Sequence, residues 1–336
     1  MHMADALVSP PVATGMAVAS LAVGAYSIFR IKKENKPENI PVMGVMGAFV
    51  FATQMVNFTI PGTGSSGHLC GGLLLSALIG PYGGFLSMMA ILLLQCLLFA
   101  DGGLMAYGCN VWNMAFYACF FGYFCIYKPI LRKNPSKKKI LIASILGSVL
   151  SLQLGAFSVT LETLISGITE LPFLTFLSFM QPIHLAIGFV EGLITSAVLI
   201  FVYNTRPEML NINEKSNEFS FKKVIAILGI VTILIGGGIS LLASSSPDGL
   251  EWSMENVSGS TELDSKGSAY DKASEIQEKT AILPDYSISN SNNEILGTSF
   301  SGILGSVLVA VILIGGSLIF RFYKKGAKNE QTRKSA

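Results

Sequence analysis

Residues 128–167 have the sequence KPILRKNPSKKKILIASILGSVLSLQLGAFSVTLETLISG, in which two contrasting segments meet. The first twelve residues contain six Lys or Arg, whereas the 28 residues that follow contain a single charged residue, Glu162. A helix of about 20 apolar residues is long enough to cross the hydrocarbon core of a bilayer. The stretch therefore predicts a membrane-spanning helix that begins at a cluster of positive charge.

The same contrast repeats along the chain of 336 residues, which is 51% hydrophobic and 13% charged, with a mean hydropathy of +0.57. This composition is far more apolar than that of a soluble globular protein. We expect an all-α polytopic membrane protein with about nine transmembrane helices, near residues 10–29, 41–60, 69–79, 83–100, 106–127, 140–167, 183–203, 224–243 and 300–320. Seven of them belong to the first part of the chain and two to the second.

The positive charges predict the orientation of these helices. Four clusters of Lys and Arg, at 30–36, 128–139, 206–223 and 321–334, hold 20 of the 23 basic residues. With nine spans, all four clusters lie on one face of the membrane. Lys and Arg accumulate in cytoplasmic loops, so the N-terminus is expected outside and the C-terminal tail inside. The net charge of +2 then reflects topology, and we expect no nucleic-acid partner.

The first apolar segment does not resemble a removable export signal, because its positive charges follow the apolar stretch instead of preceding it. We therefore expect Met1 to remain in the mature protein, and the bulky His2 to disfavour removal of the initiator. On the same outer side, the segment 244–297 carries ten Asp or Glu against three Lys. Its composition predicts a solvated, partly ordered connector.

All three histidines of the chain are expected near the outer face. His2 is the second residue, His68 lies in the glycine-rich loop PGTGSSGHLCGG (61–72), and His184 is near the outer end of a span, in QPIHLAIGFVEG (181–192). Taken singly, His2 has the alternative interpretation of a frayed terminal residue, and His68 that of a hydrogen-bonded loop residue. Taken together, their clustering favours metal binding.

A histidine at position 2 can chelate a metal ion together with the free amine of Met1. The amine, the amide nitrogen of residue 2 and the imidazole Nδ1 close adjacent five- and six-membered rings, which places three nitrogens in a plane. A nitrogen of His68 would complete a square of donors, the arrangement that suits Ni(II) or Cu(II). Because the ligands must lose their protons, binding is expected to weaken as the pH falls.

Carboxylates within membrane spans are costly and indicate function. Glu191 follows His184 by seven residues, so both lie on one face of a helix. The two side chains could orient each other or line an ion path, and a buried structural hydrogen bond is the alternative. Asp5 is a candidate to accept a hydrogen bond from His2. The five cysteines lie in or beside apolar spans and are expected to pack as small hydrophobic residues.

Four segments carry a family resemblance: MHMADALVSPPV from Met1, GTGSSGHLCGG from Gly62, ADGGLMAYGCNVWNMAF from Ala100 and HLAIGFVEGLIT from His184. In this order they resemble the CbiM/NikM family, the substrate-binding membrane subunits of nickel and cobalt energy-coupling factor (ECF) transporters. The segment SSSPDGLEW (244–252), a long outside loop and one last span resemble the PDGLE or NikN-type partner subunit, here fused to the first.

This resemblance implies a domain organisation and a ligand set. A metal-binding membrane domain occupies 1–205, a cytoplasmic linker 206–222, a PDGLE-like domain with two spans and the acidic loop 223–325, and a basic cytoplasmic tail 326–336. The metal is held by the amine of Met1, the main-chain nitrogen and imidazole of His2, and His68. His184 and Glu191 match a family motif as supporting or path residues.

The resemblance also implies that this chain is a transport subunit of a prokaryotic cell membrane and not an enzyme. The sequence contains no GxxxxGK[ST] motif, so ATP would be hydrolysed by partner ATPases that act through a transmembrane coupling (T) component. The fusion favours Ni²⁺ over Co²⁺ as the substrate. We expect Gly44, Ala48 and Ala52 to form either a docking face for the T component or a packing face within the chain.

Two other functions remain as alternatives at this stage. A secondary carrier or channel for divalent transition-metal cations would place carboxylates along several spans, for which Glu191 is the one candidate. An intramembrane metalloenzyme is disfavoured, because no histidine lies in an HExxH motif.

Overall fold

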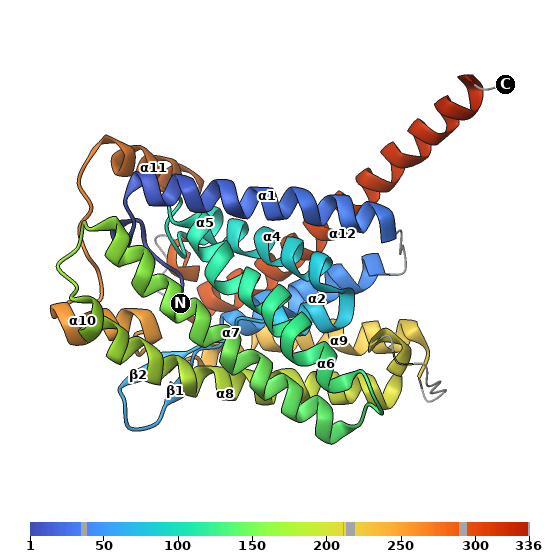
Figure 1. Ribbon diagram of the computed structural model, residues 1–336, viewed down its shortest axis with the longest axis horizontal. Coiled ribbons are helices and arrows are strands. Elements are labelled where there is room, and N and C mark those ends of the chain that lie inside the picture. Colours follow the sequence, from blue (N-terminus) through green and yellow to red (C-terminus); the bar gives the residue numbers. More distant parts are fainter. Residues whose placement is uncertain (35–38, 211, 213–218, 289–293, 335–336) are drawn as a thin grey trace.

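The computed structural model is a bundle of long helices that run side by side, with two short strands at one end (Figure 1). It describes residues 1–34, 39–210, 212, 219–288 and 294–334, and within these the side chains of 294–295 and 319–334 are left out. Residues 211 and 213–218 of the predicted linker and 335–336 of the predicted tail therefore lie outside the described residues. The longer helices are α1 (Pro10–Glu34), α2 (Asn39–Gln54), α3 (Gly72–Ile79), α4 (Pro81–Phe99), α7 (Lys137–Ser166), α8 (Phe173–Thr205), α9 (Phe221–Gly237), α10 (Gly249–Ser258), α11 (Ser268–Thr280) and α12 (Glu294–Lys334).

Between α4 and α7, three segments form one continuous helix from Tyr107 to Leu131: α5 (Tyr107–Asn110), η2 (Val111–Tyr127) and α6 (Lys128–Leu131). Its central part is π-helical, a form that usually occurs as single turns. Short 3₁₀ helices are η1 (Asp5–Leu7), η3 (Pro207–Leu210), η4 (Ile239–Leu242) and η5 (Pro284–Tyr286).

Each of the nine predicted spans contains a helix, which confirms an all-α polytopic membrane protein. Six of the described helices are long and apolar enough to cross a membrane: Pro10–Glu34, Pro81–Phe99, Tyr107–Leu131, Lys137–Ser166, Phe173–Thr205 and Leu296–Leu318. The other three, α2, α3 and α9, have 16, 8 and 17 residues. The count of nine spans stays a prediction.

Helix α7 occupies most of residues 128–167 and begins within the basic cluster. The side chain of Ser136 accepts a hydrogen bond from the backbone N–H of Lys139 and so caps the first turn. Gly167 ends the helix with a φ of 60°, a conformation that glycine adopts at little cost. The next helix, α8, was predicted to begin at residue 183, directly after Pro182. It begins ten residues earlier, at Phe173, and Pro182 lies inside it.

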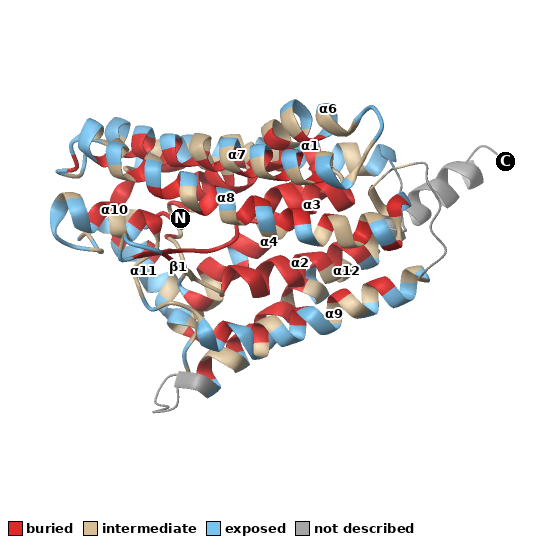
Figure 2. Ribbon diagram, turned by 90° about the horizontal axis from the view of Figure 1, so that it is seen from below, coloured by how far each residue is buried: buried red, intermediate tan, exposed pale blue. Residues whose placement is uncertain are grey.

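The short helices α2 and α3 lie in the middle of the bundle (Figure 2). All eight residues of α3 and twelve of the sixteen in α2 are buried. Both helices end inside protein, where neighbouring segments, and not lipid, surround the irregular backbone that follows. One such segment is the hairpin of β1 (Phe58–Ile60) and β2 (Ser65–Gly67), which are antiparallel and pair Thr59 with Ser66. The predicted span 41–60 is therefore wrong in its last residues, which form a strand.

The glycine-rich face of α2 packs within the chain, against α12. A Cβ atom on Gly44 would lie 2.5 Å from the side chain of Ile314, and one on Gly47 would lie 2.3 Å from that of Leu313. The hydroxyl of Ser306 donates a hydrogen bond to the carbonyl of Ala48. The small residues thus allow α12 to approach closely, and the alternative of a docking face for another protein is wrong at this position.

The acidic segment, described over 244–288 and 294–297, contains regular structure and contacts the rest of the chain. It contains α10, α11 and η5, and several of its side chains bond to the first part of the chain. The indole N–H of Trp252 donates to the carbonyl of Thr63 at 2.9 Å, and the hydroxyl of Tyr270 donates to the carbonyl of Val8 at 3.0 Å. In Figures 1 and 2 this segment, the hairpin and the N-terminus all lie at the same end of the bundle.

Candidate metal centre

The N-terminal segment is held inside the bundle and is not frayed. Asn110 forms two hydrogen bonds with the backbone of Met3, from the Met3 N–H at 2.7 Å and to the Met3 carbonyl at 3.0 Å. Gly103 donates to the same carbonyl at 2.9 Å. Met1 is 6% exposed and Met3 is fully buried. The first residues therefore have a fixed position at the end of the bundle.

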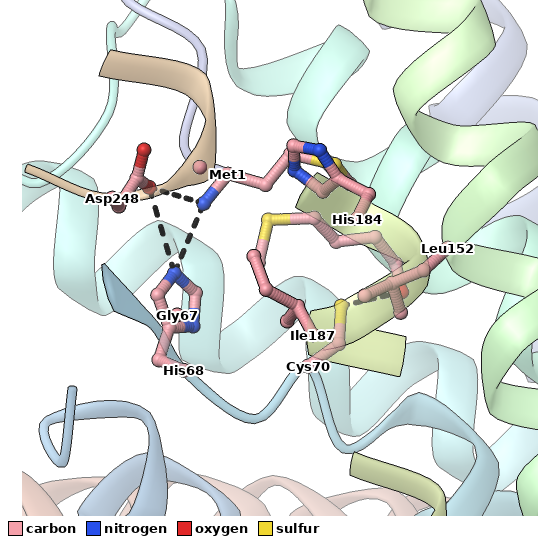
Figure 3. Close-up of a pocket in the computed structure, with 10 residues that line it drawn as sticks. Met1, Gly67, His68, Cys70, Leu152, His184, Ile187 and Asp248 are labelled. Atoms are coloured by element: carbon pink, nitrogen blue, oxygen red, sulfur yellow. Dashed lines mark hydrogen bonds and ion pairs between the residues drawn. The ribbon is translucent and has the colours of Figure 1, made fainter. Parts of the chain in front are cut away.

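The amine of Met1 faces two side chains that come from distant parts of the sequence (Figure 3). Its nitrogen lies 3.0 Å from Nε2 of His68 and 2.5 Å from Oδ2 of Asp248. The Nδ1 atom of His68 lies 3.1 Å from the carbonyl of Leu69 and donates to it when protonated. In that tautomer the lone pair of Nε2 points at the amine, as a metal ligand requires.

His2 lies beside His68, with the two rings stacked at 5.1 Å between centroids and 16° between planes. Its Nδ1 atom lies 3.0 Å from Oδ1 of Asp101, within reach of a hydrogen bond. The predicted bond between His2 and Asp5 is wrong, because Asp5 instead accepts a hydrogen bond from the N–H of Ala106 at 2.9 Å. Asp5 thus holds the N-terminal segment in place without contacting the ring.

The charges in this site are those of a buried ion pair beside two neutral rings. Burial alone would lower the pKa of the Met1 amine, but the charge and hydrogen bond of Asp248 raise it above its usual value. Burial alone would raise the pKa of Asp248, yet the ammonium group and His68 hold it below its usual range. Burial lowers the pKa of His2 and, further, that of His68. Both imidazoles are therefore uncharged near pH 7.

Glu191 positions the loop that carries His68. Its two carboxylate oxygens accept hydrogen bonds from the backbone N–H groups of Cys70 and Gly71, at 3.0 and 3.1 Å. Glu191 is fully buried in α8, so a rigid helix fixes the loop two residues after the histidine. Of the three predicted roles, the structure shows the buried hydrogen bond, and Glu191 and His184 bond to other groups and not to each other.

His184 has a different environment, although it shares a helix face with Glu191. Its Nδ1 atom lies 2.8 Å from the carbonyl of Met180 in its own helix. Its Nε2 atom is buried and has no hydrogen-bond partner among the described residues. The ring lines a small cavity next to the amine, whose other walls are Met1, Gly67, His68, Cys70, Met114, Leu152, Ile187, Asp248 and Gly249.

Sequence reasoning missed Asp248 and Asp101 as members of the site. The pattern Asp-Gly-Leu-Glu predicts a helix start, and Asp248 does cap α10 in a capping box with Glu251. The pattern carries no signal that this helix would lie against the N-terminus, 247 positions away. Within the described residues, no three His, Cys, Asp or Glu side chains form a metal-binding group.

Comparison with known proteins agrees with this architecture. Residues 2–209 match the family model of CbiM, described as the cobalt uptake substrate-specific transmembrane region. The chain belongs to the CbiM family. Residues 222–322 match a second family model, the PDGLE domain, so this CbiM protein carries both parts in one chain. With its six long apolar helices, it is a multi-pass membrane protein.

Two relatives share the fusion of parts. A putative fused nickel transport protein NikMN of Archaeoglobus fulgidus is 32% identical over 93% of this chain and 96% of its own length. A probable fused nickel transport protein LarMN of Lactiplantibacillus plantarum is 31% identical over 76% of this chain and 79% of its own. The crystal structure of a truncated transition metal transporter superposes with a TM-score of 0.53 at 29% identity, covering 60% of this chain and 98% of that one.

Replacement of Glu191 by Gln is expected to weaken Ni²⁺ binding by roughly 10- to 100-fold, the range found when a group that orients a ligand is lost. Glutamine offers one acceptor oxygen where two N–H groups need partners, so the His68 loop moves. Isothermal titration calorimetry of the purified protein measures the change. The matched control is Glu162→Gln, because Glu162 is also a buried carboxylate but bonds to Asn113 at 2.8 Å. Equal affinities of the two variants would contradict the role of Glu191.

Proposed function

We propose that this CbiM-family protein is the substrate-specific membrane component of an ATP-driven ECF transporter, which captures Ni²⁺ outside the cell and passes it inward. One observation carries the proposal: the terminal amine of Met1 is buried 3.0 Å from Nε2 of His68. Two ligands at right angles, each about 2.1 Å from an ion, lie about 3.0 Å apart. The two nitrogens thus already have the spacing of neighbouring ligands.

The proposed ligands are the Met1 amine, the main-chain nitrogen and Nδ1 of His2, and Nε2 of His68. In the structure Nδ1 of His2 bonds to Asp101, so His2 exchanges this partner for the ion when the ion binds. Rotation of an imidazole about its bond to Cβ is a local motion that leaves the fixed N-terminal backbone unchanged. A planar set of nitrogens suits Ni(II), and the two fused relatives are nickel transport proteins, so we favour Ni²⁺ over Co²⁺.

The proposed orientation has nine spans with the N-terminus outside, and the positions of the charges support it. In Figure 1 the N-terminus, α10 and α11 lie at one end of the bundle, whereas α6 and the start of α9 lie at the other. The basic cluster 128–139 belongs to this second end, opposite the site. The proposed domains remain 1–205, 206–222, 223–325 and 326–336, close to the two segments that match family models.

The proposed partners are a T component and a pair of cytoplasmic ATPases, because the chain has no nucleotide-binding motif of its own. The carrier and channel alternatives lose their main support. Both carboxylate oxygens of Glu191 are occupied by the His68 loop, so this side chain does not present a free carboxylate to an ion path.

The ligand set predicts that one extra residue before Met1 abolishes Ni²⁺ retention by the purified protein. The insertion keeps every side chain of the chain and moves only the free amine. Because Met1 is buried, the added residue has little space beside it, and its amine cannot take the position of the original one. His2→Ala and His68→Ala are expected to cause the same loss, and one extra residue after Ala336 is the matched control. Nickel bound per chain after gel filtration, measured by atomic absorption, gives the answer. Unchanged retention by the extended chain would refute the chelate.

If partner ATPases supply the energy for transport, nickel uptake by whole cells should depend on them. Uptake of radioactive nickel by cells that express this chain should require both the T component and ATPases with intact Walker A lysines. Cells that express the chain alone should match cells with an empty vector, because the chain can bind the ion but cannot release it inward. Nickel accumulation by the chain alone would instead indicate a carrier or channel.

A further inference from the structure

Asp248 reaches the candidate metal centre from the PDGLE domain, and its two oxygens have separate tasks. Oδ1 accepts hydrogen bonds from the backbone N–H groups of Leu250 and Glu251, at 2.7 and 3.0 Å, and so caps α10. Oδ2 lies 2.5 Å from the Met1 amine and 3.8 Å from Nε2 of His68. One oxygen is thus committed to the helix, and the other faces the two nitrogens.

The position of Asp248 is fixed on both sides along the chain. Before it, the carbonyl of Pro247 accepts a hydrogen bond from the N–H of Ser66 at 2.8 Å, which ties the segment to the hairpin that leads to His68. After it, Gly249 packs so closely on α8 that a Cβ atom would lie 2.8 Å from Ile187 and 3.1 Å from the ring of His184. The carboxylate is therefore part of a built site and not a mobile surface charge.

The three donor atoms have the spacing of ligands around one ion. Their separations of 2.5, 3.0 and 3.8 Å form a triangle, and the point equidistant from its corners lies about 1.9 Å from each atom, near the 2.0–2.2 Å of nitrogen and oxygen ligands on zinc. In the proposed square the main-chain nitrogen of His2 lies opposite Nε2 of His68, so Oδ2 of Asp248 would bind as a further ligand outside that square, next to the amine.

We propose that Oδ2 of Asp248 is a ligand of the transported ion, supplied by the PDGLE domain to a site otherwise built by the CbiM part. This inference rests on the proposed function, because it takes Met1 and His68 as ligands of the same ion. A carboxylate is a ligand that Ni²⁺ and Co²⁺ accept beside imidazole nitrogen. It also brings a second negative charge to a dication that would otherwise be compensated only by the deprotonated main-chain nitrogen of His2.

The test is the affinity of the purified full chain for Ni²⁺ and the visible absorption spectrum of the Co²⁺-loaded form. Asp248→Ser keeps an oxygen that caps α10 but is too short to reach the ion, and Asp248→Asn keeps the size without the charge. Glu255→Gln, an exposed acid on the same helix, is the matched control. In a Trp112→Phe background, fluorescence of Trp252 shows whether α10 stays against Thr63 in each variant.

We expect both Asp248 variants to weaken Ni²⁺ binding by at least about tenfold and to shift the Co²⁺ spectrum, with Glu255→Gln unchanged. Equal or tighter binding would overturn the proposal, since a carboxylate that only paired with the amine would compete with the ion. Affinities are compared only for variants in which the fluorescence of Trp252 shows that α10 has kept its place. If α10 moves in one Asp248 variant, the affinity of the other variant decides. His68→Ala distinguishes the failure of this proposal from the failure of the proposed function. If the His68→Ala variant also retains nickel, the proposed function fails as well.

Discussion

The rest of the site depends on the burial of the terminal amine between His68 and Asp248. A charged amine is costly to bury unless a partner of opposite charge lies beside it, and Asp248 supplies that partner. The amine belongs to the first residue, so it can be placed only if the residues after it are also held. Asn110 holds Met3, and the N–H of Ala106 holds Asp5. The sequence before α1 is accordingly a structural element and not a tail.

Three separate parts of the fold converge on this amine. The hairpin and its following loop bring His68, and Glu191 in α8 fixes that loop through two backbone bonds. The segment between α9 and α12 brings Asp248, with the small residues of α2 allowing α12 to pack closely against the first domain. A site divided in this way gives a physical reason for the second domain to be covalently linked. Without it, the charged amine would have no carboxylate partner among the contacts described.

Much of this could be predicted from the sequence, for identifiable reasons. Apolar runs and basic clusters reflect the solvent that each segment meets, so each of the nine runs contains a helix and α7 begins at its charges. His2 and His68 could be paired because chelate geometry restricts which nitrogens can share an ion. Contacts between residues far apart in the sequence produced no pattern from which they could be predicted. Asp101 and Asp248 each contact the N-terminal residues, and both contacts depend on how distant segments pack.

Other errors came from surroundings that sequence patterns do not encode. The span 41–60 was predicted too long because the apolar run continues to Ile60, yet its last residues form a strand of which only Ile60 is buried. The acidic segment was predicted to be a solvated, partly ordered connector, and few of its described residues are buried, but Trp252 and Tyr270 within it bond to the first domain. In both cases the average composition gave no information on which individual residues make these contacts.

The most direct measurement is anomalous diffraction at the nickel absorption edge from crystals of the Ni²⁺-loaded protein. We expect one strong peak about 2 Å from both the nitrogen of Met1 and Nε2 of His68, because both atoms would be ligands of the ion. A peak centred instead on His184, or on the cysteines inside the bundle, with Met1 still paired to Asp248, would contradict it.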